Sequence, residues 1–343
     1  MAIQKINSVW LHDINQSAGT SERRTFSDNN DVTDFVGKFV DKILETKRRR
    51  AYRFPRDTVE ARTLILKVHS DSGDAKSADA IADLLATAEK SASKKYGHLQ
   101  AIQDGNLLQV YFKDKTHEHC FMAKVDLMRV LDSTSLKYRD GLPVERYMMK
   151  ACLISLTPPP ACQTIWVCDS NSSIAGYWSE DFLGLEAIRN DTDNTKDSFD
   201  SIESLLVKTV KPNSPADYRR MRSGVLGYMK NQPHIVYEDM VQTVFGTYEP
   251  DADGIDMDDL RRRLGTLPEK KGFDTQFAVD RKAIARKREH SLTLTDHLEL
   301  TIKDDDAIAG TVKAVKEGAR KALRIYTDEG YDYFHSRERR GVA

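Results

Sequence analysis

Four short apolar segments between residues 106 and 169 constrain the fold of this chain most. "NLLQVYFKD" and "HCFMAKVDL" flank a polar turn, and "MMKACLISL" and "QTIWVCD" flank "TPPPA". A hydrophobic period of two on either side of a short turn is typical of antiparallel β-hairpins. Three consecutive prolines cannot lie inside a strand, so they indicate an exposed connection. We therefore predict an antiparallel sheet in this part of the chain.

The residues before these segments predict helices that pack on the sheet. Residues 31–47 place six apolar side chains at helical spacing: Phe35, Val36, Phe39, Val40, Ile43 and Leu44. Residues 76–96 show a similar pattern, with Ser77 as the expected N-cap. Residues 6–14 and 58–71 are expected to be strands. The fold class is therefore α+β, an antiparallel sheet with packed helices in the N-terminal half.

The chain after residue 170 is predicted to be helical and then to return to strands. Helices are expected over residues 175–187 and 213–229, and over the shorter segments "FDSIESLLVKTV", "YEDMVQTVF" and "MDDLRRRL". The polar stretch "RNDTDNTKDS" predicts a mobile loop. Ser214 is the expected N-cap of the second helix, with Pro215 at its first position and Asp217 completing a capping box.

The ending "SLTLTDHLELTIKD", "IAGTVKAV" and "KALRIYTDEGYDYF" predicts a C-terminal β-meander, followed by the frayed basic tail "SRERRGVA". Two domains are expected. Residues 1–169 would form an α+β domain with an antiparallel sheet, and residues 170–343 a helical middle region followed by a small β-rich part.

The net charge of −1 conceals a segregation along the chain. Residues 169–259 contain 8 basic and 18 acidic residues, a net charge of −10, between flanks of +4 and +5. Such a chain does not coat DNA by bulk charge, so any nucleic-acid contact must come from local basic patches. No apolar run is long enough to cross a bilayer, and the first residues show no secretory leader, so a cytoplasmic protein is expected. The four cysteines form no CxxC pair, which favours reduced and partly buried thiols.

Two short patterns resemble metal sites but lack ligands. "YEPDADGIDMDDL" places Glu249, Asp251 and Asp253 at the first positions of a calcium loop, but Leu260 stands where a bidentate Glu is needed. An acidic loop whose Asp256 or Asp258 caps the next helix is favoured instead. "HEHC", residues 117–120, supplies two histidines without a second ligand cluster, so a solvated hairpin tip is favoured over a metal site.

Motifs for nucleophilic hydrolysis, phosphate-binding loops, zinc proteases and dinucleotide binding do not occur in the sequence. Glu299 and Lys303 share a strand face near Asp296, which keeps a metal-dependent nuclease open as a minor alternative. We expect no enzyme activity, no catalytic or metal-ligating residues and no cofactor.

Three basic patches remain as candidates for DNA binding. The first, "KRRRAYRFPR", interleaves aromatic rings with cations that suit phosphate contacts. The other two are "YRRMR" and the predicted helix "RKAIARKR". Each patch alone is typical of a solvated surface, but together they favour nucleic-acid affinity. The candidate DNA-binding residues are Arg48, Arg49, Arg50, Arg53, Arg219, Arg220, Arg222, Arg281, Lys282, Arg286, Lys287 and Arg288.

Three motifs resemble those of the bacterial nucleoid-associated protein family. "KGFDTQFAVDRKAI" resembles its pattern of K-G-aromatic, acidic residues, Phe and x-x-Asp-Arg, "INSVWLHDI" is similar to its opening, and "YWSEDFLG" resembles its aromatic-acidic-F-L-G signature. The resemblance implies a bacterial protein of the cytoplasm and nucleoid that binds DNA, most simply double-stranded, without strong sequence preference. It brings no catalytic residues. Phe277, Asp280 and Arg281 are expected to fix a structural junction, with Asp280 as a helix cap and Phe277 as the buried staple before it.

The proline-rich connection, the acidic loop and the basic ending depart from this family and leave open a specialised relative, such as a component of an anti-phage defence locus. A second hypothesis is a protein-interaction subunit whose acidic middle region docks a basic partner, for instance a DNA-processing enzyme. The oligomeric state is left open, a homodimer included.

Overall fold

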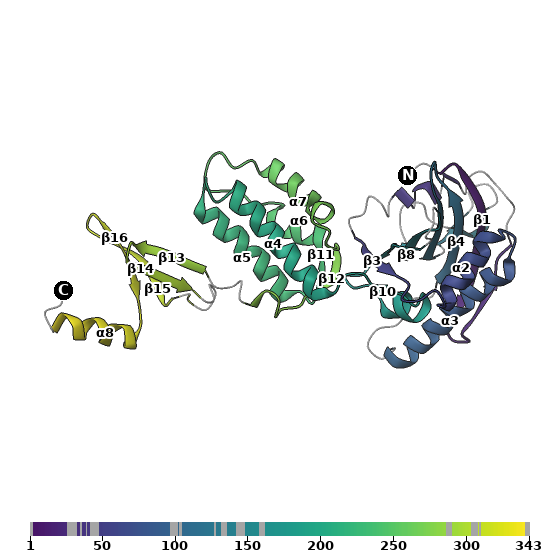
Figure 1. The fold of residues 1–343 in the computed structure, drawn as a ribbon, viewed down its shortest axis with the longest axis horizontal. Helices are drawn as coiled ribbons and strands as arrows, with labels where there is room; N and C mark the ends of the chain where they lie inside the picture. Colours follow the sequence, from purple (N-terminus) through teal and green to yellow (C-terminus); the bar gives the residue numbers. More distant parts are fainter. Residues whose placement is uncertain are drawn as a thin grey trace. The chain divides into compact units, whose positions relative to one another are not determined.

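The computed structural model describes residues 3–25, 33–34, 36–38, 40–41, 48–96, 102, 105–126, 128–131, 136–141, 148–157, 162–285, 290–302, 308 and 310–339. Contacts divide the chain into two compact units, Met1–Arg281 and Lys282–Ala343, and each is described by itself (Figure 1). The domain boundary predicted at residue 169 stays a prediction.

The first unit is built on an eight-stranded sheet in which every pair of neighbours is antiparallel. The strand order is β10-β3-β9-β8-β5-β4-β1-β2. The bounds are β1 Lys5–Asn15, β2 Thr20–Arg23, β3 Arg50–Arg53, β4 Gly105–Lys113, β5 Glu118–Val125, β8 Met148–Ser155, β9 Ile165–Asp169 and β10 Glu186–Ala187. A separate hairpin pairs β6, Met128–Leu131, with β7, Tyr138–Gly141. The predicted antiparallel sheet and the α+β class are confirmed.

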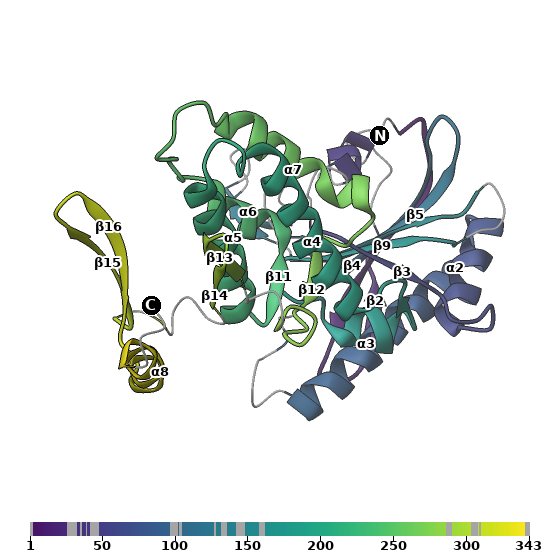
Figure 2. The same cartoon turned by 60° about the vertical axis from the view of Figure 1, so that its left-hand side comes forward.

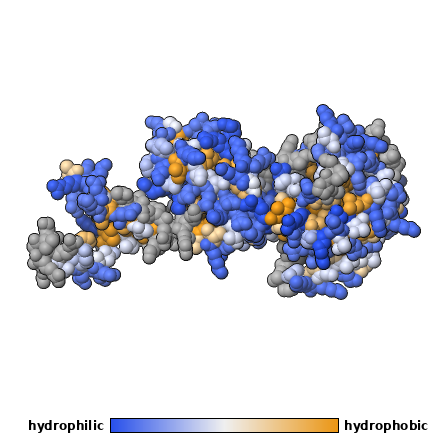
Figure 3. Space-filling view, viewed as in Figure 1, coloured by the Kyte–Doolittle hydropathy of each residue, from blue (hydrophilic) through white to orange (hydrophobic). Residues whose placement is uncertain are grey.

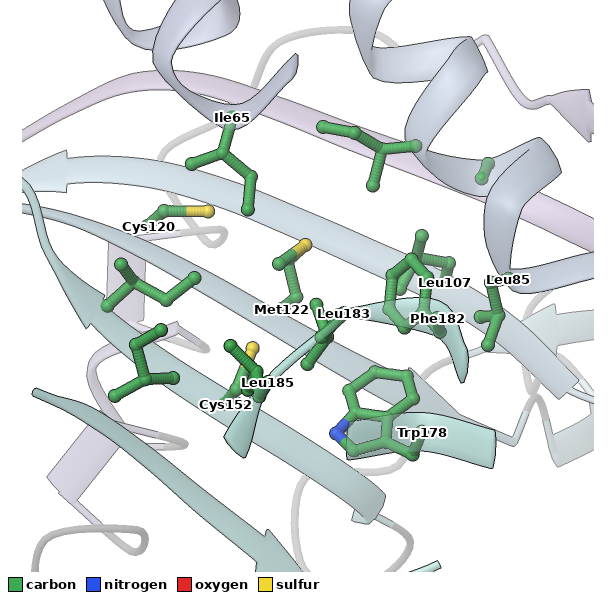
Figure 4. Packing of buried hydrophobic residues seen from close by; sticks show 14 of the residues in the cluster. Ile65, Leu85, Leu107, Cys120, Met122, Cys152, Trp178, Phe182, Leu183 and Leu185 are labelled. Carbon is green, nitrogen blue, oxygen red and sulfur yellow. The ribbon is translucent and has the colours of Figure 1, made fainter. Parts of the chain in front are cut away.

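Both faces of the central strands are buried, which explains why β4 and β5 are buried almost without a break along their length. Alternate residues serve two cores: Leu107 and Met122 point to one, and Leu108 and Phe121 to the other. The first core is covered by α2, Glu60–Ser70, by α3, Ala75–Tyr96, and by the short π-helix η1, Tyr177–Phe182. Figure 4 shows Ile65 of α2 and Leu85 of α3 above the sheet, with Trp178 of η1 beside them.

The second core is covered in part by the helix predicted over residues 31–47. The described residues of this range, 33–34, 36–38, 40 and 41, are helical, and Val36 and Val40 are fully buried against the sheet. Phe35, Phe39, Ile43 and Leu44 lie outside the described residues.

The strand predicted over residues 58–71 is wrong, because this segment is helix α2. Its buried residues are Ala61, Ile65 and Val68, at spacings of four and three that place them on one helical face toward α3 and the sheet. The N-cap predicted for α3 is also wrong. Ser77 lies inside the helix, where its backbone N–H and its hydroxyl both donate to the Asp74 carboxylate, at 3.0 and 2.6 Å.

The rest of the first unit is a helical region around a two-stranded sheet (Figure 2). Its elements are α4 Asp191–Thr209, α5 Pro215–Asn231, β11 His234–Val236, α6 Tyr237–Phe245, α7 Met257–Lys271 and β12 Gln276–Ala278. The loop predicted over residues 189–198 is wrong, since α4 begins there with Asn190 as N-cap. The predicted N-cap Ser214 and first-turn Pro215 are confirmed, as is Asp256 as the N-cap of α7.

The second unit contains two hairpins and a helix. β13, His290–Thr295, pairs with β14, Leu298–Ile302, and β15, Val312–Glu317, pairs with β16, Arg320–Ile325. Strands are present where they were predicted up to residue 325, but they form two separate two-stranded sheets, so the predicted meander is wrong, and residues 328–334, expected as strand, are helical. The prediction of a frayed tail is wrong for residues 336–339, because these residues belong to α8, Asp328–Arg339.

All four cysteines are free and buried, and burial raises the pKa of the Cys162 thiol to about 11 and of Cys168 to about 12. Within the described part of the chain, no helix combines the length and the apolar character that crossing a bilayer requires.

Candidate nucleic-acid interface

The first predicted basic patch lies where the sheet meets the helical region, and its cations face acids. Arg50 and Arg53 begin and end β3. Four arginines of the patch have an acidic partner far along the chain: Arg48 with Asp239 at 2.8 Å, Arg49 with Glu269 at 3.2 Å, Arg50 with Asp191 at 2.8 Å, and Arg53 with Glu186 at 2.7 Å. Three acids of the negative middle region, Glu186, Asp191 and Asp239, and Glu269 beyond it are therefore neutralised within the same chain.

Two of these arginines are also held by packing. The Arg49 guanidinium lies 4.5 Å from the centroid of the Trp166 ring, a cation–π contact. Arg50 is the most enclosed of the patch, with its side chain 12% exposed, and it donates to the Arg189 carbonyl at 2.9 Å. In this arrangement Arg49 and Arg50 mainly stabilise contacts within the fold. Arg53, 59% exposed, is the most accessible cation of the patch.

The segment 273–276 of the "GFDTQF" motif carries the other half of this junction. Buried Asp274 accepts from the Ala51 backbone N–H at 2.9 Å and from the Asn194 side-chain amide at 2.8 Å. Thr275 exchanges hydrogen bonds with the backbone of Arg49, and Gln276 donates to the Asp169 carbonyl at 3.2 Å. Burial raises the pKa of Asp274, while the hydrogen bonds and nearby arginines oppose that rise. Through these hydrogen bonds the motif connects the sheet, α4 and α7.

The expected roles of Phe277 and Asp280 need one correction. Phe277 is buried in β12, in agreement with a structural role. Over the described residues 281–284 the chain forms turns and not the helix that Asp280 was expected to cap, and the Asp280 carboxylate accepts from the Thr192 hydroxyl at 2.6 Å. The motif is anchored to the first turn of α4, which the sequence analysis had assigned to a loop.

The "YWSEDFLG" motif organises a buried charged cluster on the sheet. Lys124 and Lys150 are cross-strand partners on β5 and β8. Each has its own acid, Glu89 at 2.6 Å and Asp169 at 2.8 Å, and all four side chains are at least 93% buried. The Tyr177 ring lies 5.8 and 5.5 Å from the two ammonium groups. This motif also serves the architecture.

The second basic patch, on α5, divides into exposed and buried members. Arg219 is exposed. Arg220, 55% exposed, pairs with Asp251 of the acidic loop. Arg222 is 10% exposed, pairs with Glu203 at 2.6 Å and packs over the Phe199 ring. Of the three, Arg222 is placed to hold helices together.

Asp217 anchors the acidic loop whose sequence was compared with a calcium site. Its carboxylate is fully buried and accepts from the Tyr248 hydroxyl at 2.7 Å and from the backbone N–H groups of Asp251 and Ala252 at 3.2 and 3.3 Å. Burial alone would raise the pKa of Asp217, but hydrogen bonds, including one with Ser214, outweigh burial and hold it at about 2. The side chain expected to complete a capping box therefore anchors the loop.

The third patch is described only in part. Arg281 and Lys282 are exposed, whereas Arg286, Lys287 and Arg288 lie outside the described residues. Of the helix predicted over residues 281–288, residues 281–284 form turns.

The sequence analysis missed a fourth basic surface, the β15–β16 hairpin. It holds one acid, Glu317, and five exposed cations: Lys313, Lys316, Arg320, Lys321 and Arg324. The signal was visible, because these cations fall within twelve positions around Gly318. The alternating apolar residues of this segment predicted strands, and its cations were not considered as a surface.

The turn between β4 and β5 brings three metal-ligating side chains together. The ligand atoms of Asp114, His117 and His119 lie within 4.8 Å of one another, so this group could hold a metal ion. Asp114 already shapes the turn, accepting from the backbone of Thr116 and His117 and from His119 Nε2. The solvated tip expected here is wrong for His119, which is buried and stacks on Phe112. Burial lowers the pKa of His119.

The nuclease candidate Glu299 is exposed on β14 opposite Thr293, and Lys303 lies outside the described residues. Among the described residues, Glu299 belongs to no group of metal-ligating side chains.

The fold and its charged residues define an α+β protein in which an ion-paired junction joins a sheet to a helical region, followed by a unit with a basic hairpin. The model of the family described as nucleoid-associated protein YejK, NA37, matches residues 11–327, and the chain belongs to this family. The resemblance seen in the sequence is thereby confirmed. A search of curated proteins finds no match to the chain.

Proposed function

We propose that this protein is a non-enzymatic nucleoid-associated protein that binds double-stranded DNA with little sequence preference in the bacterial cytoplasm. The observation that carries the proposal is the family match, which covers most of the chain. The chemistry of the exposed cations supports it, because sequence-independent DNA binding rests on phosphate contacts from Lys and Arg.

Among the candidate residues, exposure separates those available to phosphate from those held in the fold. Arg53, Arg219, Arg220, Arg281 and Lys282 are exposed. Arg49, Arg50 and Arg222 are enclosed by acids and aromatic rings. The exposed group fits direct DNA contact better. Because Arg48–Arg53 already neutralise acids of the middle region, less of its negative charge is left to dock a foreign basic partner.

The test is fluorescence anisotropy of labelled 30-base-pair duplexes of two unrelated sequences, titrated with the full chain at 50 and 200 mM KCl. We expect similar affinities for the two duplexes and a fall of roughly 10³-fold between the two salts if about six phosphates are contacted. Absence of binding at 50 mM KCl would refute the proposal. A difference of more than about 100-fold between the duplexes would refute its lack of sequence preference.

A further inference from the structure

We infer that the β15–β16 hairpin is the element that grips the DNA backbone, as a two-stranded ribbon with cations on both faces. This inference rests on the proposed function and assigns it to a surface that lies outside the three basic patches. The first observation is that the hairpin is exposed to solvent. Every residue of β16 is exposed, and so are Lys313 and Lys316 of β15.

The register of the hairpin sets like charges against each other. Lys313 is the cross-strand partner of Arg324, and Lys316 is the partner of Lys321. Like charges placed directly opposite destabilise a β-pair. Only Glu317 offsets them within the hairpin, where it lies opposite Arg320 and pairs with Arg324 at 3.2 Å. A polyanion would relieve the repulsion, so the charges that weaken the free hairpin become favourable on DNA.

Alternation along the strands spreads the cations over both faces. Lys313, Arg320 and Arg324 share one face, and Lys316 and Lys321 occupy the other, near the turn. The turn itself is tight, with Gly318 at φ +61°, a conformation that glycine adopts without strain. Figure 3 shows the surface at this tip as predominantly hydrophilic. A ribbon with cations on both faces can contact the phosphates that line both sides of a groove.

The dimensions suit a DNA groove. Six residues per strand extend about 20 Å, and two paired strands lie about 5 Å apart, whereas the major groove is about 12 Å wide. Residues 312–325 contain no Asn or Gln, the side chains that pair best with adenine edges. The hairpin therefore supplies cations that can contact the phosphates of any sequence and lacks the side chains that read adenine.

The experiment compares two charge-matched variants of the full chain. Lys316→Gln with Lys321→Gln removes one opposed pair from the hairpin. Lys196→Gln with Lys208→Gln removes two exposed lysines from α4. Because the hairpin variant relieves like-charge repulsion, it should fold at least as well as wild type, which circular dichroism and thermal melting check. Affinity for a 30-base-pair duplex is then measured by anisotropy from 50 to 300 mM KCl.

Each phosphate contact adds about 0.9 to the slope of log affinity against log salt. We expect the slope of the hairpin variant to fall by about 2 and its affinity at 100 mM KCl to fall about 50-fold, while the α4 variant keeps the wild-type slope. If wild type binds DNA and both variants match it, the hairpin assignment is wrong and the proposed function stands. If wild type does not bind at 50 mM KCl, the proposed function fails and the hairpin assignment falls with it. A hairpin variant that keeps DNA affinity but loses self-association would assign the hairpin to contacts between copies and overturn the inference.

Discussion

The buried pair of Lys124 and Glu89 gives a prediction whose size follows from the structure. Replacing Glu89 by Gln removes the negative charge 2.6 Å from the Lys124 ammonium, and both side chains are only 1% exposed. Lys150 is the cross-strand neighbour, so the Lys124 ammonium would lose its acid and still lie beside a second cation. Breaking a buried ion pair by removing one partner costs about 3–5 kcal/mol.

An independent bound comes from proton release. A buried lysine that has lost its acidic partner can release its proton, and neutralising an ordinary amine at pH 7 costs about 4–5 kcal/mol, which limits the penalty. We therefore expect Glu89→Gln to lower the free energy of unfolding by about 4 kcal/mol. With an m-value of about 4 kcal/mol per molar guanidinium, the midpoint should shift by about 1 M.

Tryptophan fluorescence is the natural assay, because Trp10, Trp166 and Trp178 are the only tryptophans and all pack in the two cores of the sheet. The double variant Glu89→Leu with Lys124→Met is the control: it removes both charges and should lie within about 1.5 kcal/mol of wild type. Above neutral pH, Lys124 of the single variant would be partly deprotonated in the folded state. The folded state would then bind fewer protons than the unfolded state. Its deficit should therefore shrink as pH rises from 7 toward 10. A single variant as stable as wild type, or a double variant no better than the single one, would refute this account of the cluster.

Three further perturbations follow from the junction and the helical region. Asp217→Ala should cost about 2–4 kcal/mol, because it leaves the donors of Tyr248, Asp251 and Ala252 without their acceptor, and urea unfolding should reveal the loss. Since the pKa of Asp217 is held at about 2, its stabilisation is complete above the ordinary carboxyl pKa of about 4 and is lost as pH falls toward 2; an Asp217→Ala deficit that persists at pH 2 would contradict this. Arg222→Gln should lower the melting temperature by several degrees, because it removes the cation that pairs with half-buried Glu203, yet leave the salt slope of DNA binding unchanged; a reduced slope would instead place Arg222 on the DNA. Asp274→Ala should make the link between sheet and helical region more sensitive to limited proteolysis, because it removes the hydrogen bonds to Ala51 and Asn194, and an unchanged cleavage rate would count against the junction.

The sheet was predictable because its strands carry their own signal. Their alternating apolar residues and short turns are local features, and both central hairpins formed as expected. Helix α2 was missed because "LILKV" is a short continuous apolar run, which periodicity alone does not assign to strand or helix. The start of α4 was missed for the opposite reason: its buried residues are Asn194, Thr195 and Ser198, whose partners lie outside the helix or within its own backbone.

The candidate site shows the same division between local and distant signals. The cations at residues 48–53 were visible in sequence, but their acidic partners lie more than 130 residues away, so their ion pairs were not. The hairpin cations were visible and needed only the register to show that they stand opposite one another. Charge content could be read from the sequence, whereas charge pairing required the fold.

The most direct measurement of where DNA binds uses a single cysteine at the hairpin tip. Ala319→Cys would carry a photo-activated cross-linker, and Asp253→Cys in the exposed acidic loop is the matched control. The four native thiols are buried, and burial raises the pKa of each, so the added cysteine should react selectively. We predict efficient cross-linking of a 30-base-pair duplex from position 319, abolished at 300 mM KCl, and little from position 253. Binding by anisotropy without cross-linking from position 319 would contradict the assignment of DNA to the hairpin.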